Sequence, residues 1–196
     1  MNTDGDDLIK KRKATARIIC IVAAVLVLVP CLGLRWMKAG HDIDAGVSLL
    51  FVGVCGEDFD GNKKCESKSN LDVVDEWNEG APDDKKILGT FAYAGIATLF
   101  FAVIAAGALA TAGGLAFKDK FIRTPIPLTT VALLALCISL ITGCVFLGSL
   151  PKLNFGGGVS WPFFLYGVGV VGGIAGAQML AKAYSEVRDP YWDGQV

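Results

Sequence analysis

Two cysteines, Cys55 and Cys65, lie in the acidic segment GVCGEDFDGNKKCES, and their thiols could form a structural disulfide or carry out thiol–disulfide exchange. Oxygen ligands for a hard cation such as calcium also occur between them, at Glu57, Asp58, Asp60 and Asn62. Their spacing departs from the EF-hand pattern, which needs further oxygen ligands and a distant Glu. We therefore interpret this segment as a solvated acidic turn and expect no metal site.

Thiol redox catalysis usually requires a C-x-x-C pair, in which one thiolate attacks and its neighbour resolves, and the chain has no such pair. The other cysteines lie in apolar stretches, where a cysteine behaves as a small hydrophobic residue: Cys20, Cys31, Cys137 and Cys144. The single histidine, His41, has no Ser or Cys at a spacing typical of catalysis. We expect no catalytic residue and no cofactor, so a membrane thiol oxidoreductase is a remote alternative.

Charge is segregated along the chain, which has 196 residues, 53% of them hydrophobic. Four stretches contain no Asp, Glu, Lys or Arg: Ile18–Leu34, Ile87–Phe117, Thr124–Pro151 and Leu153–Ala181. A helix needs about 20 mainly apolar residues to cross a bilayer, whereas buried helices of soluble proteins rarely exceed ~14 residues without a charge. A cleaved signal peptide is the alternative for the first stretch, but that stretch exceeds the ~7 to 15 residues of a typical apolar region and no cleavage site follows.

The predicted fold class is an all-α membrane protein, a bundle of four transmembrane helices with a small extracellular β-sheet in the first loop. We expect one domain, with the fourth helix beginning near Trp161. The expected segments are an N-terminal segment at 1–17, spans at 18–34, 87–117, 124–150 and 161–183, loops at 35–86, 118–123 and 151–160, and a tail at 184–196.

Basic residues indicate the orientation of these spans. They concentrate in the N-terminal flank, the loop between spans two and three, and the tail: Lys10, Lys11, Arg12, Lys13, Arg17, Lys118, Lys120, Arg123, Lys182 and Arg188. All three segments lie on one side of a four-span topology, so the positive-inside rule places both termini in the cytoplasm. The first loop is acidic, with 7 Lys or Arg against 12 Asp or Glu, although Lys85 and Lys86 weaken the contrast.

This orientation places Cys55 and Cys65, the only cysteines outside the spans, in an oxidising compartment where disulfides persist. The segment Ser48–Val54 is β-prone, and Asp60–Asn62 resembles a hairpin turn. A disulfide closing a loop of this length stabilises the fold by roughly 2 to 3 kcal/mol. A small sheet has little core of its own, so we predict a structural Cys55–Cys65 disulfide.

The spans contain many small residues and, apart from Lys182 at the end of the fourth span, no Asp, Glu, Lys, Arg or His. In the fourth span, Gly169/Gly173 and Gly172/Gly176 fit the small-xxx-small pattern, which allows helices to approach closely in lipid. Packing within one chain is sufficient to explain these glycines, and an oligomer face is an alternative. Without intramembrane charges, a single copy is not expected to be a pump, a coupled transporter or a voltage sensor.

The whole pattern resembles the claudin-like tetraspan superfamily, which includes claudins, peripheral myelin protein 22 and calcium-channel gamma subunits. The resemblance comprises the topology, Trp36 directly after the first span, the C-x9-C spacing of Cys55 and Cys65, and the GGGVSWPF entry to the fourth span. Val52 stands where the family signature Gly-Leu-Trp has its tryptophan. The resemblance implies a left-handed helix bundle under an extracellular sheet, a disulfide between two strands, and a place in the plasma membrane.

The same resemblance implies roles in cell contact, paracellular barriers or channel modulation. The first hypothesis is a non-enzymatic structural protein that self-associates through its outer loops, and the alternative is an accessory subunit of a channel or transporter complex. The expected partners are the lipid bilayer and either further copies or a larger membrane complex, with no nucleic acid. The tail ends in Val196, which suits a PDZ pocket, but Gly194 offers no side chain at the class-setting position.

Overall fold

The structure is a computed structural model that describes residues 3–38, 44–57, 63–83, 86–116, 125–150 and 158–192. The chain divides into two compact units, where the sequence led us to expect one domain. The first unit comprises Met1–Leu28, Phe101–Cys137 and Gly167–Val196, and the second comprises Val29–Phe100 and Ile138–Tyr166.

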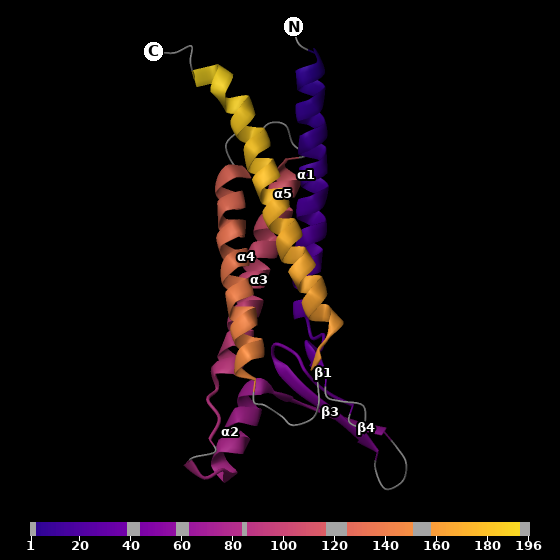
Figure 1. The fold of residues 1–196 in the computed structure, drawn as a ribbon, viewed down its shortest axis with the longest axis vertical. Helices are drawn as coiled ribbons and strands as arrows, with labels where there is room; N and C mark the ends of the chain where they lie inside the picture. Colours follow the sequence, from indigo (N-terminus) through magenta and orange to yellow (C-terminus); the bar gives the residue numbers. More distant parts are fainter. Residues whose placement is uncertain are drawn as a thin grey trace. The chain divides into compact units, whose positions relative to one another are not determined.

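Four long helices dominate the chain (Figure 1). Their bounds are Thr3–Cys31 for α1, Thr90–Leu115 for α3, Pro125–Ser149 for α4 and Trp161–Trp192 for α5. Each contains a segment long and apolar enough to cross a membrane: Lys10–Cys31, Thr90–Leu115, Pro127–Ser149 and Trp161–Ser185. The prediction of a helical, multi-span membrane protein is therefore confirmed.

Large apolar side chains are exposed along these segments, as expected for helices in contact with lipid. Ile18 in α1, Leu134 in α4 and Val171 in α5 are 61%, 61% and 69% exposed. Many buried positions are held by alanine, including Ala102, Ala105 and Ala132, each 0% exposed. A helix on the surface of a soluble protein shows the reverse pattern, with a polar outer face.

The ends of the helices differ from the expected span boundaries for local reasons. Helix α1 begins at Thr3, well before residue 18, because the basic stretch that precedes the span consists of good helix formers. It ends at Cys31, where Gly33 adopts a φ of +90° that side chains disfavour. Helix α5 begins at Trp161, as expected, and continues past residue 183 to Trp192.

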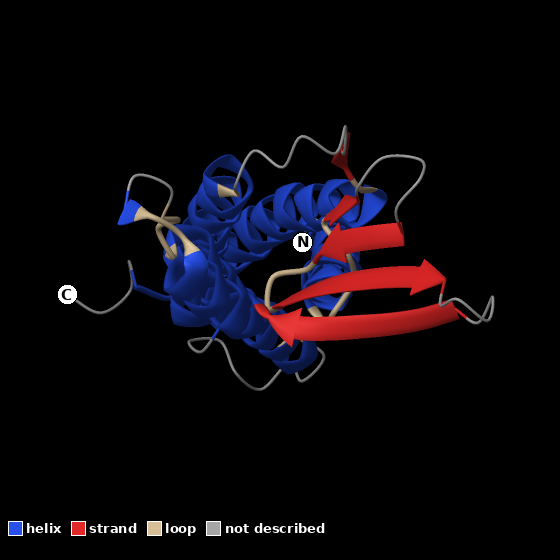
Figure 2. Ribbon diagram, turned by 90° about the horizontal axis from the view of Figure 1, so that it is seen from below, coloured by secondary structure: helices blue, strands red, loops and turns tan. Residues whose placement is uncertain are grey.

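A five-stranded antiparallel sheet has the order β4-β3-β2-β1-β5 (Figure 2). The strands are β1 (Met37–Lys38), β2 (Asp44–Val47), β3 (Phe51–Glu57), β4 (Lys63–Ser69) and β5 (Gly158–Val159). The small sheet predicted between the first two spans is confirmed. It also includes β5, which comes from the segment between α4 and α5 and pairs with β1. No local pattern of two residues could have predicted this pairing.

Strand β3 begins at Phe51 and not at Ser48, where the β-prone stretch begins, because Ser48 closes a turn. Its amide donates to the Phe51 carbonyl at 2.8 Å, and its hydroxyl bonds the Phe51 amide at 3.0 Å. The hairpin turn predicted at Asp60–Asn62 lies outside the described residues.

A further helix, α2 (Asn70–Gly80), follows β4 within the first loop and was not predicted. The Ser69 hydroxyl caps it by accepting a hydrogen bond from the Asp72 amide at 3.1 Å. Asn78 then holds the chain leading to α3, since its amide group donates to the Ile87 carbonyl and accepts from the Ile87 amide.

Candidate functional site

The disulfide joins the two longest strands of the sheet. Cys55 in β3 lies directly opposite Cys65 in β4, and the two are bonded, which confirms the prediction. Cys55 is buried at 8% exposure, whereas Cys65 is exposed. The bond therefore fixes the register of a strand pair that has solvent on one side.

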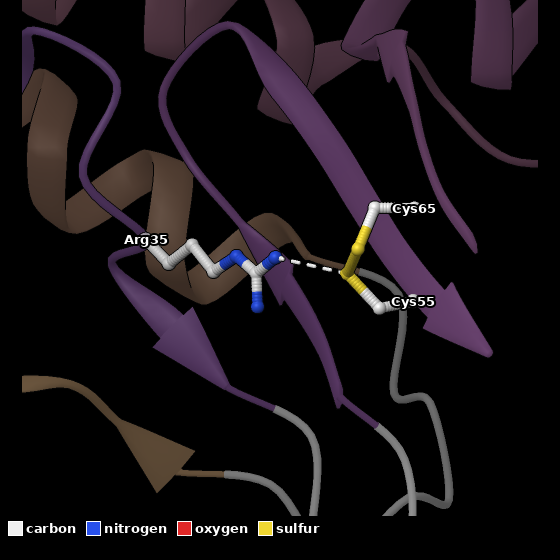
Figure 3. The surroundings of a disulfide bond; sticks show 3 residues. All are labelled: Arg35, Cys55 and Cys65. Carbon is white, nitrogen blue, oxygen red and sulfur yellow. Dashed lines mark hydrogen bonds between the residues drawn. A yellow bond between two sulfur atoms is a disulfide. The ribbon is translucent and has the colours of Figure 1, made fainter. Parts of the chain in front are cut away.

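Arg35 lies beside this disulfide (Figure 3). Its Nη2 donates to the Cys55 Sγ at 3.8 Å. The Arg35 side chain lies over Gly46 in β2 and Gly53 in β3, which are paired with each other across the two strands. A Cβ on Gly46 would overlap the Arg35 Cδ, and one on Gly53 would lie 3.6 Å from Nη2. The two glycines thus leave a shallow channel for the arginine, and sequence reasoning missed it because only the strand register brings them together.

The Cys55–Cys65 disulfide acts here as a structural cross-link, with one of its cysteines buried. An external thiol could reach the exposed Cys65 sulfur more easily than the buried Cys55 sulfur.

Trp36, one of the features on which the family resemblance was based, is completely buried in the second unit. Its ring centroid lies 6.0 Å from that of Phe146, 5.5 Å from that of Phe163 and 5.0 Å from that of Tyr166. The indole Nε1 donates to the Pro30 carbonyl at 2.8 Å, in the last turn of α1, where carbonyls lack partners within the helix. Trp36 therefore caps α1 and anchors α4 and α5 around the beginning of the sheet.

Hydroxyl groups connect α3, α4 and α5 within the same unit. The Ser139 hydroxyl donates to the Thr98 carbonyl at 3.0 Å, so the Tyr166 hydroxyl, 2.6 Å away, donates to Ser139. The Thr98 hydroxyl also bonds that of Thr142 at 3.0 Å. Every group in this network is neutral, which suits packing between helices in lipid.

Asn70, the first residue of α2, holds the turn between β2 and β3. Its Nδ2 donates to the Ser48 and Leu49 carbonyls at 3.1 and 2.9 Å, and its backbone amide donates to the Leu50 carbonyl. Helix α3 approaches this turn so closely at Gly95 that an added Cβ would overlap the Leu49 carbonyl. The loop helix, the sheet and α3 are therefore packed as one body in the second unit.

The glycines predicted to mediate packing in α5 differ from one another. A Cβ on Gly169 would lie 2.8 Å from backbone atoms of Leu26 and Val27 in α1. At Gly173 and Gly176 the nearest atoms would be 2.9 Å away and belong to side chains. Gly172 has only an ordinary contact, 3.8 Å to the Ala23 Cβ. Three of the four predicted glycines thus lie at close approaches within the first unit.

The loop surface of the second unit carries opposite charges on neighbouring elements. Lys68 in β4 bonds Glu76 in α2 at 2.7 Å, and this hydrogen bond and the carboxylate charge raise the pKa of Lys68. Because the pKa is raised, the contribution of the pair is present at neutral pH and is lost only as the pH rises through that value. Both side chains are about half exposed, so the pair contributes little to stability.

The remaining candidate residues do not form a site in the described ranges. Cys20 and Cys31 are buried, and Cys137 and Cys144 are exposed on α4. Within the described residues, no group of three or more His, Cys, Asp or Glu side chains could hold a metal ion. Other candidates lie outside the described residues: His41, Asp58, Asp60, Asn62, Gly194 and Val196.

Comparison with known proteins adds no functional assignment. No protein-family model matches the sequence, and no curated protein matches it either.

Proposed function

We propose that this protein is a non-enzymatic, claudin-like structural protein of the plasma membrane, with both termini in the cytoplasm, that self-associates through the loop between its first two spans. The observation that carries the proposal is the firm construction of this loop. The Cys55–Cys65 disulfide, the buried Trp36 and the Asn70 hydrogen bonds connect the strands and the helix in the described part of this loop. A preformed surface loses little conformational entropy on association.

Charge complementarity supports a second copy of the chain as the occupant of this surface. Strand β4 has the sequence KKCESKS, with three lysines against one glutamate. Helix α2 has the sequence NLDVVDEWNEG, with four acidic residues and no basic one. Within one chain, Lys68 of β4 already pairs with Glu76 of α2, and the net charges that remain are +1 on β4 and −3 on α2. Strand β4 of one copy can therefore still attract α2 of the next copy, and this attraction favours one relative orientation of the two copies.

Exposed apolar side chains accompany these charges. Trp77 on α2 is 52% exposed, Val54 on β3 is 48% exposed and Leu88, just before α3, is 82% exposed. Tryptophan is among the residues that contribute most to protein interfaces. A contact that buries Trp77 within a ring of paired charges fits the usual anatomy of an interface.

Charge reversal tests the proposal. We expect the wild-type protein to form oligomers in mild detergent, measured by analytical ultracentrifugation. Lys64→Glu and Glu79→Lys should each reduce the oligomeric fraction, and combining them in one chain should restore it, because the attraction between copies is then re-established. Lys182→Glu on α5 is the control and should leave the oligomeric fraction unchanged.

A wild-type protein that stays monomeric at high concentration would contradict self-association. If a native purification then recovered the monomer bound to a larger membrane protein, the result would favour the accessory-subunit alternative.

A further inference from the structure

A partly open cavity of about 180 Å³ lies in the second unit, at the turn that joins β2 to β3 and at the beginnings of α2 and α3. It is lined by Leu49, Leu50, Phe51, Ser69, Asn70, Leu71, Ala92 and Ile96. All of these side chains are apolar except those of Ser69 and Asn70. The cavity is therefore an apolar recess whose polar side chains lie only where α2 begins.

The side chain of Asn70 has a hydrogen-bond acceptor without a partner. Asn70 is 2% exposed, and its Oδ1 is buried and accepts no hydrogen bond from any described residue. The orientation of the amide group is fixed, because its Nδ2 donates to both the Ser48 and Leu49 carbonyls. A buried acceptor without a donor destabilises the fold, so a donor that comes from outside the chain would bind here favourably.

The chemistry of this acceptor selects the group that can bind it. Phosphate and carboxylate groups are themselves acceptors and would be repelled by the oxygen. An ammonium group would need a negative charge, and none of the residues that line the cavity carries one. A water molecule needs roughly two to four polar partners, but Ser69 already accepts from the Asp72 amide. A single neutral hydroxyl group on an apolar molecule fits best.

The position of the cavity indicates that this molecule comes from the membrane. Ala92 and Ile96 belong to the candidate span Thr90–Leu115, so the cavity lies where that span begins. Apolar side chains at the cavity and on the next turn of α3 are exposed: Phe51 at 48%, Ile96 at 41% and Phe100 at 59%. Because Ile96 and Phe100 are four residues apart, they share one face of the helix. A molecule whose hydroxyl group enters the cavity can extend along this face within the lipid.

We propose that this cavity binds the hydroxyl group of a membrane sterol, with the Asn70 Oδ1 as acceptor and the ring system lying along Ile96 and Phe100. A sterol has one hydroxyl group and a rigid body, so it loses less conformational entropy on binding than a diacylglycerol with flexible chains. Phe51 and Leu71 are 48% and 36% exposed, and their side chains can move aside to admit the hydroxyl group. The proposal depends on the membrane-spanning architecture and not on self-association.

The test uses the full-length protein in phosphatidylcholine nanodiscs, labelled with a photoreactive cholesterol analogue that keeps its hydroxyl group. Unlabelled lipids compete with this probe at equal mole fractions, and mass spectrometry locates the labelled residues. We expect saturable labelling at the cavity. Cholestanol and cholestanone differ only in that a ketone replaces the hydroxyl group. Cholestanone should therefore compete about five-fold or more weakly, as expected for the loss of one buried hydrogen bond.

Two variants test the location of the sterol. Ile96→Trp places a larger side chain at the cavity and should remove the saturable labelling. Ile138→Trp is the matched control, since Ile138 is 39% exposed on α4 and does not line the cavity, and it should be labelled like the wild type. A non-reducing gel that detects the Cys55–Cys65 bond checks that each variant has folded. The comparison of cholestanol with cholestanone uses the wild type, so it tests the acceptor even if Ile96→Trp does not fold.

Four results would overturn the proposal. The absence of saturable labelling in the wild type would mean that the cavity binds no sterol. Equal competition by cholestanol and cholestanone would show that the hydroxyl group is not recognised. Equal competition by dioleoylglycerol would show a site for any neutral lipid with a hydroxyl group rather than for a sterol. Equal labelling of folded Ile96→Trp and Ile138→Trp would place the sterol outside this cavity.

Discussion

Cys55 and Cys65 act at the scale of single residues as one unit, because they share one bond across a strand pair in fixed register. We predict that Cys55→Ser, Cys65→Ser and the double substitution each lower the free energy of unfolding by about 3 kcal/mol, the value for a closed loop of this length. Thermal unfolding in detergent and abundance at the cell surface measure the effect. A double substitution much worse than either single one would mean that the cysteines contribute separately.

Helix α5 shows how the position of a glycine within an element decides its role. A Cβ on Gly169 would meet the α1 backbone at Leu26 and Val27, which cannot move aside as a flexible side chain can. We predict that Gly169→Ala destabilises the protein by about 1 to 3 kcal/mol, the usual cost of overpacking.

Gly167→Ala in the same helix is the matched control, since an added Cβ there meets nothing within 4 Å. It should be neutral or stabilising by up to about 1 kcal/mol, because alanine favours helix over glycine. Denaturation of the two variants in the same detergent compares them directly, and equal stabilities would contradict the packing of α5 against α1.

At the scale of the whole molecule, the effect of a charged substitution depends on whether lipid or water surrounds the substituted side chain. Val171 in the middle of a candidate span and Leu88 outside the spans are 69% and 82% exposed. In water, both positions would accept lysine. In lipid, only Leu88 would, because a lysine at the centre of a transmembrane helix costs about 2.5 to 3.5 kcal/mol on insertion scales.

We therefore predict that Val171→Lys strongly reduces the fraction of protein resisting carbonate extraction from membranes, while Leu88→Lys leaves it unchanged. Equal tolerance of both substitutions, with protein recovered in the aqueous fraction, would be the behaviour of a soluble protein and would contradict the four-span architecture.

The amino-acid sequence by itself determined the four spans and the disulfide. A bilayer imposes a minimum length of uncharged helix, and this requirement is met within each segment independently of the others. Cys55 and Cys65 were identifiable because they are the only cysteines outside those segments. Even Trp36 was recognisable as important, although its sequence neighbours do not reveal that it caps α1 at Pro30.

Only the tertiary structure decided the pairing of β1 with β5, the channel that holds Arg35 and the cavity beside Ser160. Helix α2 is an intermediate case, since Ser69 and Asp72 form a recognisable cap that the acidic composition of the loop obscured. The physical reason is separation along the chain. Gly46 faces Gly53 only through strand register, and Lys38 approaches Trp161 only through a strand pair more than a hundred residues apart in sequence. Such contacts depend on how the whole chain packs, and no local pattern contains that information.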